Sequence, residues 1–124
     1  MAREWIVLIV DDEPDNLSIV AKYLELQGIT VYTAANGKQA LQILEGLHPD
    51  CILLDMAMPH MSGWDVLTQI RMDSEIGNVP VIALTAHVMH ATKADVLSYG
   101  FDAYITKPFD LNQVLKEVQH WLGR

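Results

Sequence analysis

"WIVLIV" (residues 5–10) is an unbroken apolar run, and "DDEP" (residues 11–14) follows it directly. A strand that is apolar on both faces is typical of a parallel sheet covered by helices on either side. Three adjacent carboxylates repel one another, and burial makes each anion costlier still. The junction is therefore either a solvated loop at the end of a strand or a site that holds a cation, and the rest of the sequence decides between these.

Outward from this junction, strand-like and helix-like segments alternate along the chain. Apolar or alternating runs predict further strands at residues 30–34, 51–54, 79–84 and 103–106. Amphipathic spacing predicts helices at residues 15–27, 63–72, 89–98 and 111–122, and one after Asn36-Gly37 that carries Ala40, Leu44 and Leu47 on one face. Five βα units predict an α/β domain in which a parallel sheet carries helices on both faces.

The totals limit what kind of protein this is. A chain of 124 residues suits one domain at 1–124, and a hydrophobic share of 51% supplies a core. The net charge of −8 argues against non-specific binding to nucleic acid, and no apolar run is long enough to span a bilayer. The single cysteine, Cys51, cannot form an internal disulfide. We expect a cytoplasmic domain that binds neither nucleic acid nor membrane.

Reactive side chains stand at the carboxyl ends of the predicted strands, where sheets of this kind bind ligands. They are Asp11 and Asp12 after 5–10, Asp55 after 51–54, Thr85 after 79–84, and Lys107 after 103–106. Clustered carboxylates offer the hard oxygen ligands that Mg²⁺ prefers, and an aspartate can act as a nucleophile that forms an acyl phosphate. A metal ion and a lysine can neutralise the oxygens of a transferring phosphoryl group. The chain has no glycine-rich phosphate loop, which disfavours nucleotide binding.

Four stretches in this order and spacing resemble the receiver domain of two-component response regulators, over the whole chain. They are "LIVDDEP" (8–14), "ILLDMAMPHMSGWD" (52–65), "ALTA" (83–86) and "YITKPF" (104–109). The resemblance, which is nearest to chemotaxis-like single-domain regulators and the receivers of hybrid kinases, implies the flavodoxin-like doubly wound (βα)5 fold. The strand order would be 2-1-3-4-5. No output domain is expected within the 124 residues.

The resemblance also implies a metal and a phosphorylation site. Asp55 would accept a phosphoryl group from a phosphohistidine on a sensor histidine kinase or a histidine phosphotransfer protein. Asp12 matches the direct ligand of Mg²⁺, and Asp11 matches the partner that acts largely through water. The backbone carbonyl of Ala57 matches the third protein ligand, and Asp55 completes the metal site. Mn²⁺ could substitute for Mg²⁺.

The same resemblance implies a two-state switch. Thr85 matches the switch hydroxyl, Tyr104 the switch aromatic and Lys107 the phosphate-binding lysine, with a cis Lys107–Pro108 bond. Phosphorylation would draw Thr85 toward the phosphoryl group and turn Tyr104 inward. The surface formed by the fourth helix, the last strand and the last helix would then change its preference for a downstream protein partner. A phosphorylation-dependent dimer is a further expectation.

Two positions are expected to tune the lifetime of the phosphoryl group. Ala57 and His87 match the side chains that flank the path of the attacking water in the family. Ala57 has no polar atom to orient that water, and the ring of His87 could shield the phosphoryl group, so we predict slow self-dephosphorylation. We interpret Glu13 as a solvated residue and Asp65 as an acid placed favourably near the start of a helix.

Two other functions compete with the switch. A hydrolase of the haloacid dehalogenase type also uses an aspartate after a parallel strand, but it needs a second aspartate two residues on, where this chain has Ala57. A degenerate receiver would bind partners without phosphorylation, but all five site residues are present here. We therefore expect a phosphoacceptor switch that assists its own phosphorylation, rather than a turnover enzyme.

Overall fold

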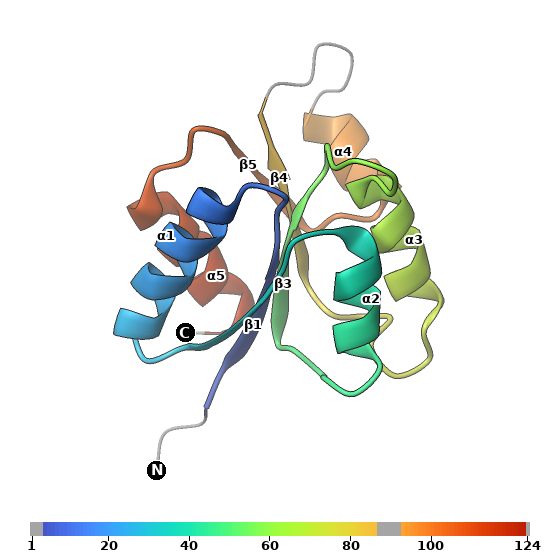
Figure 1. The fold of residues 1–124 in the computed structure, drawn as a ribbon. Coiled ribbons are helices and arrows are strands. Elements are labelled where there is room, and N and C mark those ends of the chain that lie inside the picture. Colours follow the sequence, from blue (N-terminus) through green and yellow to red (C-terminus); the bar gives the residue numbers. More distant parts are fainter. Residues whose placement is uncertain (1–3, 87–92, 124) are drawn as a thin grey trace.

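Five parallel strands form one sheet through the middle of the molecule in the computed structural model, which describes residues 4–86 and 93–123 (Figure 1). Their bounds are Ile6–Val10 (β1), Thr30–Ala34 (β2), Cys51–Asp55 (β3), Val81–Thr85 (β4) and Ala103–Thr106 (β5). The order across the sheet is β2-β1-β3-β4-β5, with every neighbouring pair parallel. The flavodoxin-like fold and the strand order expected from the sequence are confirmed.

Helices cover both faces of the sheet. They are Pro14–Leu26 (α1), Gly37–Leu44 (α2), Gly63–Met72 (α3), Lys93–Tyr99 (α4) and Leu111–Trp121 (α5). Helices α1 and α5 lie on one face, and α2, α3 and α4 lie on the other (Figure 1). None of the helices in the described ranges is long and apolar enough to cross a membrane.

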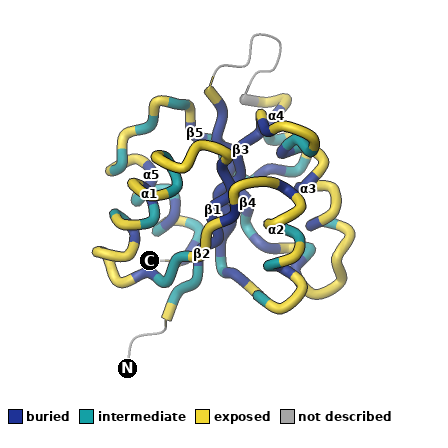
Figure 2. The backbone as a smooth tube through the Cα atoms, viewed as in Figure 1, coloured by how far each residue is buried: buried dark blue, intermediate teal, exposed yellow. Residues whose placement is uncertain are grey.

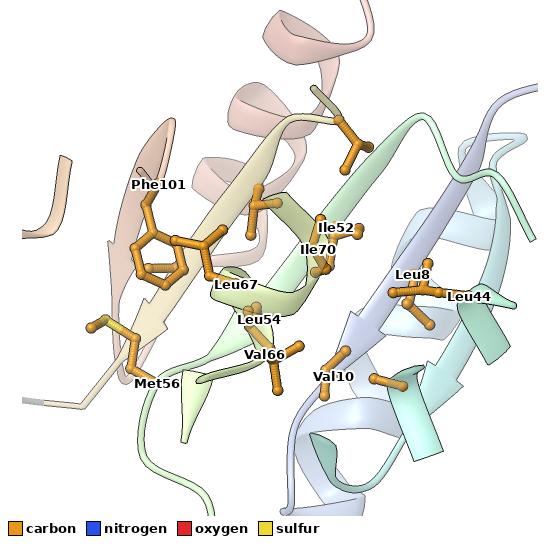
Figure 3. Close-up of a cluster of buried hydrophobic side chains, with 14 of the residues drawn as sticks. Leu8, Val10, Leu44, Ile52, Leu54, Met56, Val66, Leu67, Ile70 and Phe101 are labelled. Carbon is orange, nitrogen blue, oxygen red and sulfur yellow. The ribbon is translucent and has the colours of Figure 1, made fainter. Parts of the chain in front are cut away.

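The sheet separates two hydrophobic cores, because successive residues of a strand point to opposite faces. Leu8 and Leu54 pack under α2 and α3 on one face, as Figure 3 shows, whereas Val7 and Leu53 pack under α1 and α5 on the other. Strands β3 and β4 are buried along their whole length, and the exposed residues gather on the outer surfaces of the helices and in the loops (Figure 2). The central strands are therefore fixed in register by burial on both sides.

The register of the strands brings their carboxyl ends to one level. Val10 at the end of β1 is paired with Leu54, so Asp11 lies level with Asp55. Thr85 at the end of β4 is paired with Thr106 at the end of β5. The side chains that the sequence placed at strand ends consequently share one edge of the sheet.

Two strands end later, and one begins later, than the sequence predicts. Asp55 and Thr85 are the last residues of β3 and β4 rather than the first residues beyond them. Strand β4 starts at Val81 instead of Val79, because the N–H of Val79 is used in a turn and Pro80 has no N–H to donate. Strand pairing thus fixes the backbone of Asp55 and of Thr85.

Helix α2 is shorter than its apolar spacing predicts. It ends at Leu44, where the N–H groups of Glu45 and Gly46 bond three residues back and tighten the chain into a turn. Leu47, which we expected on the inner face of this helix, therefore lies beyond it and is half-buried. Of the helix predicted at 89–98, residues 89–92 lie outside the described ranges. The remaining predicted ends fall within one residue of the observed ones.

Candidate functional site

Three carboxylates meet at the carboxyl ends of β1 and β3. One oxygen from each of Asp11, Asp12 and Asp55 can be chosen so that all three lie within 4.8 Å of one another. Asp11 and Asp55 are buried, with exposed fractions of 1% and 3%, whereas Asp12 is exposed. Two of the three anions are thus held away from water, so their mutual repulsion is poorly screened.

Lys107 reaches into this group from the end of β5. Its Nζ lies 2.9 Å from Asp11 Oδ2 and 3.2 Å from Asp55 Oδ2, and only 10% of its side chain is exposed. Burial by itself would lower the pKa of the Lys107 ammonium, but the contacts with Asp11 and Asp55 outweigh it, so the pKa is raised. Lys107 is therefore held as a cation between two buried carboxylates.

Asp55 is the carboxylate whose environment resists ionisation. Burial raises its pKa from 3.8 to about 6 and outweighs the N–H of Ala57, which donates to Asp55 Oδ1 at 3.1 Å and lowers the pKa. The negative charge of Asp11 raises the pKa further, and Lys107 opposes it. One ammonium therefore does not neutralise the group, and a second cation would stabilise it.

The donor set fits a hard divalent cation. Asp11 Oδ2 is buried and, apart from its ion pair with Lys107, accepts no hydrogen bond within the described part of the chain. A buried carboxylate oxygen with an unused lone pair, beside two further carboxylates, is the oxygen-rich environment that Mg²⁺ prefers. Asp11, Asp12 and Asp55 are the residues that could hold it. Ala57 is exposed in the loop after β3, and the part assigned to its carbonyl stays a prediction.

Thr85 ends β4, and Tyr104 stands on the neighbouring strand β5, where it pairs with Ala83. Thr85 is 4% exposed, and its backbone carbonyl accepts a hydrogen bond from the N–H of Lys107 at 2.6 Å. Tyr104 is half-buried and packs against the core under α2, α3 and α4. Thr85 follows Ala83 of the same core by two residues, so it projects to that same face of the sheet. Their part in switching stays a prediction.

The loop between β3 and α3 is held close to Asp55. His60 adopts a φ of +69°, which is unusual for a residue with a side chain, and the N–H of Met61 bonds to Pro59 O at 2.8 Å. The N–H of Gly63 donates to Met56 O at 3.0 Å, and a Cβ on Gly63 would lie 2.5 Å from the backbone oxygen of Asp55. The start of α3 thus rests directly on the backbone that carries Asp55.

The structure also places other residues that the sequence analysis named. The Lys107–Pro108 peptide bond is cis. Asp65 closes a capping box with Ser62 at the start of α3, so it serves that helix rather than the site. His87 lies outside the described residues.

Sequence reasoning missed one residue at the site. We interpreted Glu13 as solvated, and its side chain is indeed 64% exposed, yet its Oε1 lies 3.9 Å from Lys107 Nζ. The only sign of this contact in the sequence is that Glu13 is the third of three consecutive acids. Such a run does not indicate which way the side chain of Glu13 points.

Comparisons with known proteins bear on the family and the fold of this chain. The family model of the response regulator receiver domain matches residues 7–119. The polar-differentiation response regulator DivK of Brucella ovis is 32% identical over 117 residues, which cover 94% of this chain and 95% of DivK. The chemotaxis protein CheY4 of Vibrio cholerae superposes with a TM-score of 0.88 at 30% identity, covering 95% of this chain and 98% of CheY4.

A further structural neighbour was solved with a metal ion. The receiver domain of a sensor histidine kinase from Pseudomonas aeruginosa, solved with a magnesium ion coordinated in its active-site cleft, superposes with a TM-score of 0.87. It is 30% identical, and the match covers 98% of this chain and 100% of that domain.

Proposed function

Because this chain belongs to the family of response regulator receiver domains, we propose that it is a phosphorylation-controlled switch in which Asp55 accepts a phosphoryl group from a phosphohistidine. The donor would be a sensor histidine kinase or a histidine phosphotransfer protein. One observation carries the proposal: a buried carboxylate, a second buried carboxylate and a buried ammonium converge within ion-pair distance at the end of the sheet.

The transfer is a displacement at phosphorus. An Oδ atom of Asp55 forms the new P–O bond while the P–N bond of the phosphohistidine breaks, and the imidazole leaves with the electron pair of that bond. The Lys107 ammonium, already 3.2 Å from Asp55 Oδ2, neutralises charge on the phosphoryl oxygens. The hydroxyl of Thr85 can donate to another of these oxygens.

The metal of the proposed site is Mg²⁺, for which Mn²⁺ could substitute. Asp11, Asp12 and Asp55 would hold it together with the backbone carbonyl of Ala57. When bound, the cation supplies positive charge that offsets the crowded carboxylates and the phosphoryl oxygens. The fit rests on the unused lone pair of Asp11 Oδ2 and on the three converging carboxylates.

The output of the switch is proposed at the surface formed by α4, β5 and α5. Phosphorylation replaces the carboxylate of Asp55 by an acyl phosphate whose phosphoryl group carries about −1.5 to −2 charge units, and it biases a pre-existing equilibrium. Movement of Thr85 toward the phosphoryl group would let Tyr104 turn inward, which alters that surface and its affinity for a downstream protein or a second copy of the chain.

The phosphoryl lifetime is proposed to be long. Ala57 is exposed beside Asp55 and offers a methyl group in place of a side chain that could orient a water molecule. His87 would add shielding, and comparing the decay of the acyl phosphate in the parent and in His87→Ala between about pH 6 and 8 checks its share.

The deciding experiment is phosphorylation by acetyl phosphate with Mg²⁺, followed by intact mass measurement. We expect one hydroxylamine-labile phosphoryl group on the parent and on Asp15→Asn, which removes an exposed acid of α1, and none on Asp55→Asn. A stoichiometric, labile phosphoryl group on Asp55→Asn would reject Asp55 as the acceptor. A parent that stays unmodified would point to a phosphorylation-independent module, and steady turnover of phosphoesters would point to a hydrolase.

A further inference from the structure

Glu13 occupies the N-cap position of α1 but does not cap it. Its backbone is extended, with φ −96° and ψ 111°, and its side chain makes no capping hydrogen bond. Acids before a helix ordinarily accept a hydrogen bond from the first turn, so the usual structural reason for such a residue is missing here. The carboxylate instead lies 3.9 Å from the Nζ of Lys107.

Glu13 stands at the rim of a hollow that leads to Lys107. The hollow measures about 500 Å³, and its lining includes Glu13, Asn16 and Lys107 together with apolar side chains such as Ile19 and Phe109. The side chain of Glu13 is 64% exposed and that of Lys107 only 10% exposed. The carboxylate therefore lies at the outer part of the hollow and the ammonium at its inner part. A molecule that reaches Lys107 through this hollow passes the Glu13 carboxylate. Asp55 does not line the hollow, but its Oδ2 lies 3.2 Å from the Lys107 Nζ.

The charge of Glu13 is not balanced by the rest of the site. Three carboxylates and one ammonium carry an excess of negative charge that one divalent cation would offset. Glu13 adds a further negative charge on the approach side, and its contact with Lys107 is the longest of the three that this ammonium makes with carboxylates. The approach therefore stays negative after the inner group has been neutralised.

We propose that Glu13 is a specificity-determining residue that selects phosphoryl donors by the charge of their leaving group. This proposal rests on the proposed function. Acyl phosphates approach as dianions with an oxygen leaving group, and the carboxylate repels them. Donors with a protonated nitrogen on phosphorus, such as phosphoramidate or a protonated phosphoimidazole, place a positive charge beside the carboxylate and are attracted.

Both donors give the same product through balanced steps. With acetyl phosphate, an Asp55 oxygen bonds to phosphorus, the P–O bond to the acetyl group breaks, and acetate leaves with the electron pair. With phosphoramidate the P–N bond breaks, and the nitrogen, which already carries its extra proton, leaves as ammonia. The two reagents therefore differ in charge at the leaving group while they report on the same acceptor.

The test compares the phosphorylation rates of the parent, Glu13→Gln and Asp15→Asn with each donor, at Mg²⁺ concentrations that saturate each variant. Asp15→Asn is the matched control, since it removes one exposed charge from the first turn of the same helix. We expect Glu13→Gln to accelerate the acetyl phosphate reaction about three- to tenfold and to leave the phosphoramidate reaction equal or slower. High salt should shrink that difference, because the side chain is exposed.

A second readout avoids phosphoryl transfer altogether. In the Asp55→Asn background, inorganic phosphate at a pH where it is a dianion should bind several-fold more tightly once Glu13→Gln is added, as followed by NMR chemical shifts. Equal acceleration of both donors, or an Asp15→Asn effect as large as that of Glu13→Gln, would overturn the proposal. If the parent accepts phosphoryl groups from neither donor, the proposed function itself fails, whereas a parent that reacts with an unchanged donor ratio in Glu13→Gln rejects only the role of Glu13.

Discussion

Burial and the Lys107 ammonium act in opposite directions on the ionisation of Asp55. It is almost inaccessible to solvent, it has Lys107 at 3.2 Å, and the negative Asp11 lies beside it. The proposed role of Asp55 would gain from this conflict, because a cation or an incoming phosphoryl group would meet a carboxylate that is incompletely neutralised. The same opposition of burial and charge predicts how the stability of the metal-free protein depends on pH.

Stability should fall as the pH rises when a chelator keeps the protein free of metal. The folded state raises the pKa of Asp55 from 3.8 to about 6, so it binds the proton more tightly than the unfolded chain does. The resulting stabilisation is fully present below the unfolded value and is lost as the pH rises through the folded value, with a magnitude on the order of 2–3 kcal/mol. Asp55→Asn lacks this loss, so its advantage over the parent in urea unfolding should grow between about pH 4 and 7.5. A constant difference across that range would contradict it.

At the scale of elements, α3 connects the carboxylate site to α4, which lies on the same face of the sheet. It starts on the backbone of Asp55 and Met56 through Gly63. Its Trp64 ring packs edge to face on Tyr99 of α4, with ring centroids 4.6 Å apart. Helix α3 therefore joins the end of β3 to α4 through direct contacts.

The contact of Gly63 with β3 should tolerate no side chain. A Cβ there would lie 2.5 Å from the oxygen of Asp55 and 2.7 Å from the Cα of Met56, both of which are backbone atoms. We expect Gly63→Ala to lower the free energy of unfolding by about 1–3 kcal/mol, because the start of α3 must move away from the strand. The matched control is Gly46→Ala, where no atom lies within 4 Å, and its change should stay within about 0.5 kcal/mol. Equal midpoints in urea for both variants would exclude the close contact.

Arg71 joins the end of α3 to two loops. It should contribute more to the free energy of unfolding than its partly exposed position suggests. It donates to Gly77 O, Val79 O and Gly100 O and forms an ion pair with Asp102 at 3.0 Å. Arg71→Met leaves these acceptors to water or without a partner, so we expect a loss of about 2–4 kcal/mol in unfolding free energy.

Two further variants check that Arg71 stabilises the fold through these bonds. Arg71→Lys should recover only part of the loss, since one ammonium cannot reach the same acceptors as a guanidinium. The neighbouring Met72 is 74% exposed, and Met72→Ala should change the stability by less than about 0.5 kcal/mol. An Arg71→Met variant as stable as the parent would mean that water replaces all of these bonds without loss.

For the whole molecule, the position of the site follows from the order of the strands. The chain leaves β1 toward β2 on one side and returns to β3 on the other, so the order of the strands reverses at β1, where folds of this kind bind ligands. Asp11 and Asp12 follow β1 and Asp55 ends β3 at this point, and Lys107 reaches over from the end of β5. A metal bound there would hold together segments that are distant in sequence.

Mg²⁺ should accordingly raise the melting temperature of the entire domain. A ligand present at 100 times its Kd adds about 2.7 kcal/mol when only the folded state binds it. We expect the rise in the parent and in Asp15→Asn, its reversal by a chelator, and its loss in Asp12→Ala, which removes the exposed member of the three carboxylates. An Asp12→Ala variant with the full response would remove Asp12 from the metal site.

The sequence by itself determined the strands, the layer order and the main members of the site. Apolar runs such as 5–10 and 51–54 identify buried parallel strands locally, and each run places its following carboxylate at a known edge of the sheet. The family resemblance added the strand order, and the register of β1 with β3 brought Asp11 level with Asp55 as this requires. The strands and the carboxylates that follow them were readable because each depends on neighbours along the chain, whereas the strand order came from the resemblance.

Only the tertiary structure decided which distant groups meet and in what direction. Arg71 and Gly100 are 29 residues apart and make contact through the packing of α3 against the loop before β5, which no local pattern encodes. Gly63 is required by the approach of β3, not by the helix that it begins. Glu13 turns toward Lys107, 94 positions along the chain, because β5 ends beside β4 and its lysine crosses to the first strand, whereas periodicity alone leaves an acid in a loop without an orientation.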